Sequence, residues 1–204
     1  MSSNRMNFCM GRFKYLIKNV KTSVIEHFGS RKKIIDEQLI IIWSHKSFAY
    51  YVFNTVYNLL MFLSLTPQND LRYSEVIFRE RPQRARIDID SGTNYFYTKI
   101  MKGLKELTDD HISVCDMSRE DYFSRHIIID HFYNSMDEAK EHIVIPLINM
   151  IGDPNHYIDL NVYHDIQNFR LTGSTKSGPT DPIKKIISIH TTFEQTLIGK
   201  YILQ

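Results

Sequence analysis

Cysteine is scarce in this 204-residue chain, which contains only Cys9 and Cys115. Two cysteines cannot build a disulfide framework or a cysteine-rich zinc site, so we expect no zinc and an intracellular, reducing compartment, either cytoplasm or nucleus. Long apolar runs are also lacking, because Leu39–Trp43 is only a short stretch and a membrane-spanning helix needs about 20 such residues. The sequence also has no secretory signal pattern. It therefore predicts no membrane partner.

An excess of one charge sign is lacking as well. The net charge is +2, so overall charge gives no argument for a nucleic-acid partner. The charges are unevenly placed, however, because residues 1–33 carry eight Lys or Arg and one acid, Glu26, while the remainder is slightly acidic. We interpret this basic start as an amphipathic helix of the mature protein rather than a mitochondrial presequence. Hydrophobic content of 43% and charged content of 24% are ordinary for a globular protein.

Helical spacing dominates the first third of the chain. Apolar residues recur every three or four positions over residues 13–24, with lysines on the other side. A second helical region is expected over residues 36–65, and we interpret its many aromatic side chains as core. The sequence therefore predicts a basic, helical N-terminal part over residues 1–65 that packs on a core formed by residues 66–204.

After residue 70 the hydrophobic period changes, and strands alternate with helices. The first two strands are expected to form a hairpin around a turn at residues 79–82, and a capping box at Ser135 opens the second helix. The expected strands cover residues 73–78, 84–90, 111–117, 123–130, 158–163, 168–172 and 183–190. The expected helices cover residues 95–107, 136–151 and 193–201. This order predicts an α+β fold.

Two carboxylates stand on one face of the strand at residues 84–90. Asp88 and Asp90 are two positions apart, so their side chains point to the same side, while Ile87 and Ile89 point away. Two acids this close repel each other unless a cation lies between them. A divalent metal is one interpretation, and a solvated strand end is the other, because a lone D-x-D pattern is a weak signal.

Asp159, directly after Ile158, supplies a third carboxylate. Together with Asp88 and Asp90 it would complete a site for two Mg²⁺ or Mn²⁺ ions, the ligand set expected for displacement at phosphorus. By itself it is an ordinary turn aspartate.

Four further side chains suit an anionic ligand. Ser124 and His126 share a face of one expected strand, and Arg170 projects from another with the geometry for bidentate phosphate binding. Lys176 lies in a Gly/Ser/Thr loop that lacks the spacing of a P-loop. Each feature alone has a structural explanation: a satisfied pair at a strand edge, a surface salt bridge or an ordinary loop.

Taken in order, these motifs resemble the archaeo-eukaryotic primase superfamily. The likeness is to the PrimPol branch and to the primase domains of large DNA virus primase-helicases, such as those of poxviruses. Arg170 lies eleven residues after Asp159, and Lys176 lies six after Arg170, which is similar to PrimPol spacing. The segment 74–78 also resembles the one that precedes the acidic motif in that family. The likeness covers about residues 73–202.

The resemblance implies an α+β primase-type catalytic core in which two RRM-like βαβ halves face a cleft. It implies a DNA primase-polymerase that performs template-directed, metal-dependent nucleotidyl transfer on single-stranded DNA during replication. Nucleoside triphosphates and single-stranded DNA would be its ligands, and a replicative helicase a further candidate partner; a viral protein would act at the viral replication site. The implied metal ligands are Asp88, Asp90 and Asp159, which are catalytic together with His126. The implied triphosphate contacts are Ser124, His126, Arg170 and Lys176.

The chain also departs from the family pattern. The second acid is Asp90 where many relatives have Glu, and Tyr122 stands where PrimPol has a phosphate-binding lysine. Arg125 could supply that charge, although its side chain should point to the opposite face of the strand. The basic N-terminal part, with Arg84 and Arg86, is our candidate for binding template phosphates. Two other functions stay open: an inactive module that binds single-stranded nucleic acid or docks on a helicase, and a two-metal nuclease.

Overall fold

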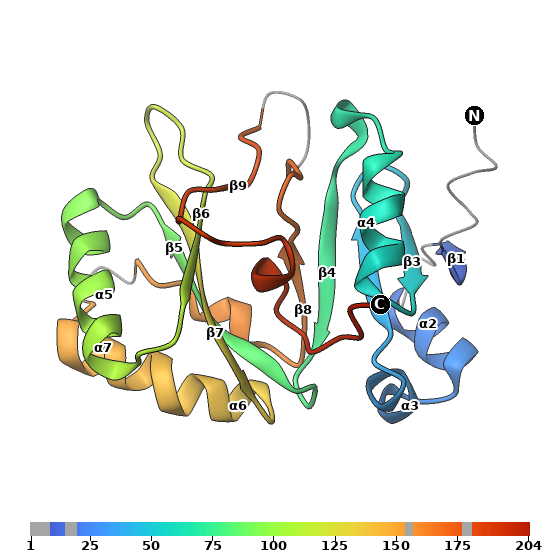
Figure 1. Cartoon of the computed structure of the whole chain (residues 1–204), viewed down its shortest axis with the longest axis horizontal. Helices are drawn as coiled ribbons and strands as arrows, with labels where there is room; N and C mark the ends of the chain where they lie inside the picture. The colour runs from blue at the N-terminus through green and yellow to red at the C-terminus, as the bar shows by residue number, and fades with distance from the viewer. Residues whose placement is uncertain (1–8, 15–19, 154–156, 177–180) are drawn as a thin grey trace.

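Two antiparallel sheets stand side by side in the computed structural model, with helices packed around them (Figure 1). The structure describes residues 9–14, 20–153, 157–176 and 181–204. The strand orders are β1-β3-β2-β4-β8 and β5-β7-β6-β9. This confirms the predicted α+β class. Within the described ranges, no helix is both long enough and apolar enough to cross a membrane.

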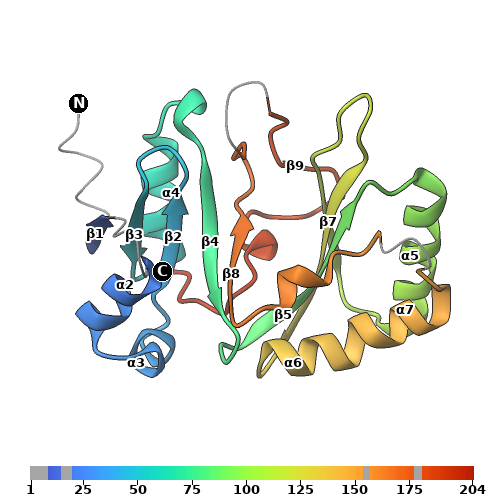
Figure 2. The same cartoon turned by 180° about the vertical axis from the view of Figure 1, so that it is seen from behind.

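The first sheet is covered on both faces. One face carries α4 and the end of the chain, and the other carries α2 and α3; Figure 2 shows α2 and α3 from the far side. Burial on both faces explains why the central strands β2 and β3 are nearly continuous apolar runs without alternation. The strands are β1 (Gly11–Lys14), β2 (Ile40–Ser44), β3 (Ala49–Phe53), β4 (Tyr73–Phe78) and β8 (Ile166–Arg170). The helices are α2 (Val20–Phe28), α3 (Arg31–Asp36) and α4 (Val56–Ser64).

The predicted helix over residues 36–65 is therefore wrong for most of its length. Residues 40–53 form the β2–β3 hairpin, and only α4 is a long helix in this region. The sequence here is rich in β-branched and aromatic residues, which favour strands. The predicted helix over residues 13–24 also differs, since β1 occupies 11–14, α2 begins at Val20, and residues 15–19 lie outside the described part. β2 pairs directly with β4, so residues on either side of position 65 share one sheet.

The aromatic side chains assigned to the core are mostly buried. Trp43, Tyr50 and Phe62 are each less than a tenth exposed. Phe48 and Tyr57 are the exceptions, at 62% and 56% exposed.

The second sheet is built around a split βαβ unit. β7 lies between β5 and β6 and is antiparallel to both, so α5 connects two strands that are not neighbours. Tyr157 and Asp159 bond to the free edge of β5, through Asp159 N to Asp88 O (2.8 Å) and Asp90 N to Tyr157 O (2.9 Å). The strands are β5 (Gln83–Asp90), β6 (Ile112–Asp116), β7 (Ser124–Tyr133) and β9 (Lys185–Ile186). The helices are α5 (Asn94–Leu107), α6 (Met136–Ala139) and α7 (Ile145–Ile151), with a π-helical stretch over Lys140–Val144.

All the helices of this unit pack on one face of its sheet. Ile87 and Ile89 of β5 join α5 and α7 in a single apolar cluster on that face, and both views show these helices on the side away from β8 (Figures 1 and 2). The opposite face of β5 and β7 is therefore turned toward the first sheet, where Ile128 packs against Ile77 and Phe169. That face carries the predicted site.

Several predicted elements are confirmed and others are not. Strands and helices overlap the ranges expected at 73–78, 84–90, 111–117, 123–130, 168–172, 95–107 and 136–151, although β7 continues to Tyr133 and β8 begins two residues early. β4 and β5 are not a hairpin, because they belong to different sheets. The three remaining ranges form a single bridge at Ile158 followed by a 3-10 helix over Leu160–Tyr163, the short β9, and a 3-10 turn over Glu194–Thr196.

Glu75 in β4 holds the C-terminal segment against the first sheet. Its carboxylate is fully buried and accepts hydrogen bonds from the backbone N–H groups of Ile198 (2.9 Å) and Gly199 (2.8 Å) and from the hydroxyl of Tyr201 (2.6 Å). The negative charge strengthens each of these bonds. One side chain thereby connects β4 to a segment more than 120 residues later.

We expect Glu75→Gln to lower the free energy of unfolding by about 2 kcal/mol. A carboxamide lacks the negative charge, and its N–H₂ group would face the N–H and O–H donors that the carboxylate accepts from. Urea unfolding followed by circular dichroism measures this. Glu80→Gln is the matched control, since Glu80 is exposed and its change should leave the unfolding midpoint unchanged. Equal effects of the two variants would contradict the buried role of Glu75.

Candidate metal and phosphate site

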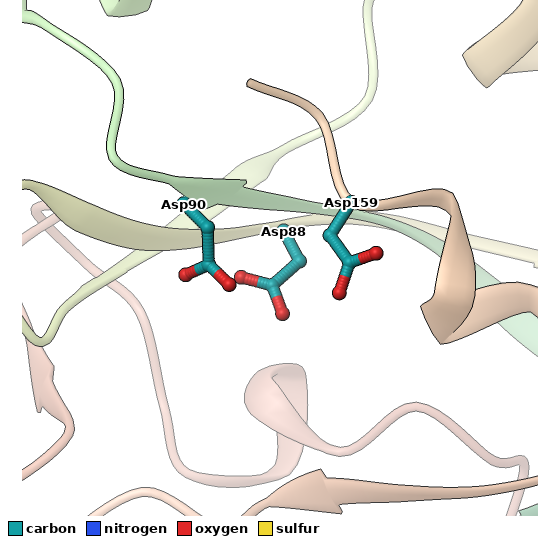
Figure 3. Close-up of side chains that lie close together, drawn as sticks. All are labelled: Asp88, Asp90 and Asp159. Atoms are coloured by element: carbon teal, nitrogen blue, oxygen red, sulfur yellow. The ribbon is translucent and has the colours of Figure 1, made fainter. Parts of the chain in front are cut away.

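Three aspartates meet at the end of β5. Alternation places Asp88 and Asp90 on the face opposite the apolar cluster of Ile87 and Ile89, and the backbone bond to Asp88 sets Asp159 beside them. One carboxylate oxygen from each lies within 4.8 Å of the others. Figure 3 shows the three carboxylates pointing to the same side of the strand.

The electrostatics of the cluster reflect this crowding. Burial raises the pKa of Asp90, and the neighbouring charges of Asp88 and Asp159 raise it further. Burial also acts to raise the pKa of Asp88, but His126 and the positive charge of Lys184 outweigh it and lower that pKa. Asp88 is therefore ionised at neutral pH, and the crowding that raises the pKa of Asp90 favours a bound cation.

The donor set fits a hard divalent metal. Three carboxylates at this spacing offer the oxygen ligands that Mg²⁺ and Mn²⁺ prefer. Oδ1 of Asp88 is buried and accepts no well-formed hydrogen bond from the residues described; Nε2 of His126 lies 3.3 Å from it. A buried oxygen without a donor is available as a ligand. The cluster could therefore hold a metal ion, as predicted.

His126 is fixed by stacking and burial. Its ring lies 4.1 Å from the ring of Phe169, at an interplanar angle of 29°, and pairs across β5 and β7 with Asp88. Burial lowers the pKa of His126 to about 4, although Asp88 opposes this. The imidazole is therefore neutral at pH 7, and it can donate one hydrogen bond without adding a charge.

Ser124 and Tyr122 both contact the second aspartate. Oγ of Ser124 donates to Oδ1 of Asp90 at 3.3 Å, and the phenol of Tyr122 acts to lower the pKa of the same carboxylate. Burial raises the pKa of Tyr122, so this residue is a neutral donor at pH 7. A neutral phenol beside Asp90 does not replace the positive charge of a lysine.

A cavity of about 200 Å³ separates the two sheets at this point. One wall carries Asp88, Asp90 and neutral donors of the second sheet, together with Arg119 of the loop between β6 and β7. The facing wall carries the cations Arg170 and Lys176 from β8 and the loop after it, together with Asp181. Asp159 lies beside Asp88 and does not line the cavity. The lining residues are Asp88, Asp90, Met117, Arg119, Tyr122, Ser124, His126, Arg170, Lys176, Asp181 and Pro182. The structure thus brings together six of the predicted site residues, with the seventh adjacent.

The two arginines of β5 have structural contacts within the protein, and their contact with template phosphates stays a prediction. Arg84 is buried, pairs with Asp130 at 2.7 Å and covers the ring of Phe132. Arg86 is completely buried and donates to Gln83 Oε1 (2.7 Å) and to a backbone carbonyl. Both guanidinium groups are therefore already held by contacts within the protein.

Arg125 points away from the cavity, as predicted. Its guanidinium donates to Asp116 (3.2 Å) and lies over the rings of Tyr97 and Phe123. It therefore cannot supply the charge that Tyr122 lacks. Most basic residues of the predicted N-terminal basic part lie at positions 1–8 and 11–23, and the side chains at these positions are outside the described part of the structure.

Two residues near the site were missed from sequence. Phe169 supplies the surface on which His126 stacks, and Lys184 is completely buried behind it. Nothing in the sequence distinguishes Lys184 from its exposed neighbour Lys185. The comparisons with known proteins add no further assignment: no protein-family model matches the sequence, and no curated protein matches it either.

Proposed function

We propose that this chain is a DNA primase-polymerase core that adds nucleotides to a primer strand along a single-stranded DNA template. The observation that carries the proposal is the opposition of charges across one cavity. Carboxylates on one wall suit metal ions, and Arg170 and Lys176 on the facing wall suit phosphates. A metal-bound nucleoside triphosphate combines both features in one ligand.

The topology also supports the proposal. β5, α5, β6, β7, α6–α7 and the segment at Ile158 follow one another in the chain, and the strands lie in the spatial order Ile158, β5, β7, β6. This is the ferredoxin-like arrangement, which is also the arrangement of the RRM-like halves that the motif resemblance implies. The first sheet supplies Arg170 from its edge strand β8.

Each residue then has a defined part in the reaction. Asp88, Asp90 and Asp159 would hold Mg²⁺ or Mn²⁺, which when bound neutralises charge on the attacking and leaving oxygens. Arg170 and Lys176 would bind the triphosphate as fixed cations. Ser124 and the neutral imidazole of His126 would donate hydrogen bonds that orient its oxygens.

The reaction forms one bond and breaks one. The primer 3′-hydroxyl gives up its proton to water, and its oxygen bonds to the α-phosphorus of the incoming nucleotide. The bond from that phosphorus to the bridging oxygen breaks, and pyrophosphate leaves with the negative charge. Little covalent work falls to the protein, so positioning and electrostatic stabilisation supply most of the rate.

A primer-extension assay tests the proposal. The protein is incubated with an end-labelled primer on a single-stranded template, with nucleoside triphosphates and Mn²⁺ or Mg²⁺, and the products are separated by length. Lengthened primers are expected. Shortened primers would instead indicate a two-metal nuclease, and unchanged primers with measurable DNA binding would indicate a binding module.

A further inference from the structure

Lys184 is a cation buried behind the phosphate-facing wall of the cavity. Its side chain is completely inaccessible. Nζ donates to the backbone carbonyl of Arg170 at 2.7 Å and lies 4.3 Å from the centre of the Phe169 ring. Among the described residues no carboxylate forms a salt bridge with it. Lys184 therefore contacts the backbone of one site residue and the ring that supports another, His126.

The backbone of Lys184 closes the base of the loop that carries Lys176. Its N–H donates to the carbonyl of Ser174 (3.0 Å), and its carbonyl accepts from the N–H of Gly173 (2.8 Å). Gly173 has a φ of 85°, a left-handed conformation that suits glycine. A single residue thus joins β8, the ring under His126 and the start of the Lys176 loop.

Burying an ammonium group costs desolvation free energy, so its presence at this position calls for a physical reason. Burial lowers the pKa of Lys184 to about 8, so the group is still mostly protonated at pH 7. An apolar side chain of similar length would fill the same space without the desolvation cost. The ammonium therefore acts on the groups around it, and the two residues that it contacts, Arg170 and Phe169, belong to β8 on the cation-bearing wall of the cavity.

We propose that Lys184 is a positioning residue for triphosphate binding. Its ammonium fixes the backbone at Arg170 and the ring of Phe169, and its backbone fixes the entrance to the Lys176 loop. Arg170, His126 and Lys176 are thereby held in place before the ligand arrives, which lowers the ordering cost of binding. The inference rests on the proposed function only in taking a nucleoside triphosphate as the ligand.

The test compares Lys184→Met with Lys185→Met, its exposed neighbour. Isothermal titration calorimetry measures the Kd of a non-hydrolysable nucleoside triphosphate in Mg²⁺, and fluorescence anisotropy measures the Kd of primer-template DNA. We expect Lys184→Met to weaken triphosphate binding at least tenfold and to leave DNA binding within twofold. Lys185→Met should change neither. A merely structural role would lower the fraction of binding-competent protein and leave the Kd of that fraction unchanged.

A measurement on the wild-type protein decides the matter if Lys184→Met does not fold. Triphosphate binding should weaken as the pH rises from 7 to 9.5, because Lys184 loses its proton near pH 8. The groups that face Lys184 are Glu75 of β4, Arg170 of β8, Cys115 of β6 and Asp88 of β5. The Cys115→Ala variant should show the same weakening of triphosphate binding between pH 7 and 9.5. That result would assign the pH dependence to Lys184 rather than to the Cys115 thiol.

The outcomes separate the inference from the proposed function. Equal triphosphate affinities of Lys184→Met and Lys185→Met, or a flat pH profile of the wild type, would overturn the role of Lys184. Wild-type protein that binds triphosphate but extends no primer would overturn the polymerase assignment. The triphosphate affinities of Lys184→Met and Lys185→Met could still be compared. Wild-type protein that binds no triphosphate would overturn both.

Discussion

Replacing Asp88 or Asp90 by asparagine is expected to reduce primer extension by about 10³-fold or more. Metal ions contribute several kcal/mol of charge stabilisation to phosphate chemistry, and each 1.36 kcal/mol is about a tenfold change in rate. A carboxamide keeps the size of the side chain but cannot neutralise a cation. Single-turnover extension rates measure the loss, and Asp109→Asn, at an exposed acid, should extend at the wild-type rate.

The same two variants should move stability in opposite directions in metal-free protein at pH 7. The pKa of Asp90 is raised in the folded state, so its ionised form opposes folding above the ordinary carboxyl pKa, and Asp90→Asn removes that cost. The pKa of Asp88 is lowered, so its ionised form stabilises the fold at pH 7, and this contribution is lost as the pH falls through the lowered pKa. Asp88→Asn is therefore destabilising.

Urea unfolding in EDTA distinguishes the two effects, and repeating it with Mn²⁺ tests metal binding directly. The wild-type midpoint should rise with Mn²⁺, because a ligand that binds only the folded state stabilises it. Both variants should lose most of that rise. If the variants extend primers at the wild-type rate, or if Mn²⁺ does not change the wild-type unfolding midpoint, the three carboxylates do not form the metal site.

The second half of the chain was largely predictable from its hydrophobic period. β5 alternates, with Ile87 and Ile89 facing the helices and the acids facing away, and α5 shows helical spacing over the predicted range. Period identifies an element when one face is buried and the other is open. The α5 and α7 helices meet these conditions because they cover a single face of the sheet.

The first sheet was not predictable in the same way. β2 and β3 are buried on both faces by helices, so their sequences are apolar throughout and carry no period of two. A short, fully apolar run cannot be told from a buried helix by period alone. The predicted β4–β5 hairpin is wrong for a different reason. Two strands joined by a short turn can belong to different sheets, and the sequence of the turn does not indicate whether they pair.

The site residues show what alternation can and cannot settle. Arg84 and Arg86 have the same parity as Asp88 and Asp90, and β5 has a register irregularity between the two arginines. Whether a residue number in a strand is odd or even indicates which face of the sheet its side chain occupies. It does not indicate whether that part of the face is covered or open. The end of the face with the acids opens on the cavity, while the end with Arg86 is covered, and which end is covered depends on residues far away in the chain, such as Val162 and Phe169.

Arg86→Ala is expected to lower the free energy of unfolding by about 3–5 kcal/mol, one of the largest losses from a single change in this protein. The guanidinium donates to Gln83 and to the carbonyl of Val162 and lies 4.9 Å from the centre of the Tyr163 ring. Alanine leaves the two acceptors buried without a donor and a cavity in place of the long side chain. Arg79→Ala is the control, since Arg79 is exposed and pairs with the exposed carboxylate of Asp137. Urea unfolding should separate the two variants clearly.

The salt dependence of DNA binding then distinguishes a structural arginine from a phosphate contact. Each phosphate contact contributes about 0.7 to the slope of log K against log salt for a single strand. Measured where Arg86→Ala is still folded, that slope should equal the wild-type slope, because the guanidinium never reaches the DNA. A slope lower by a full contact, with little loss of stability, would mean that Arg86 is exposed to the strand and that the cover over this end of β5 opens in solution.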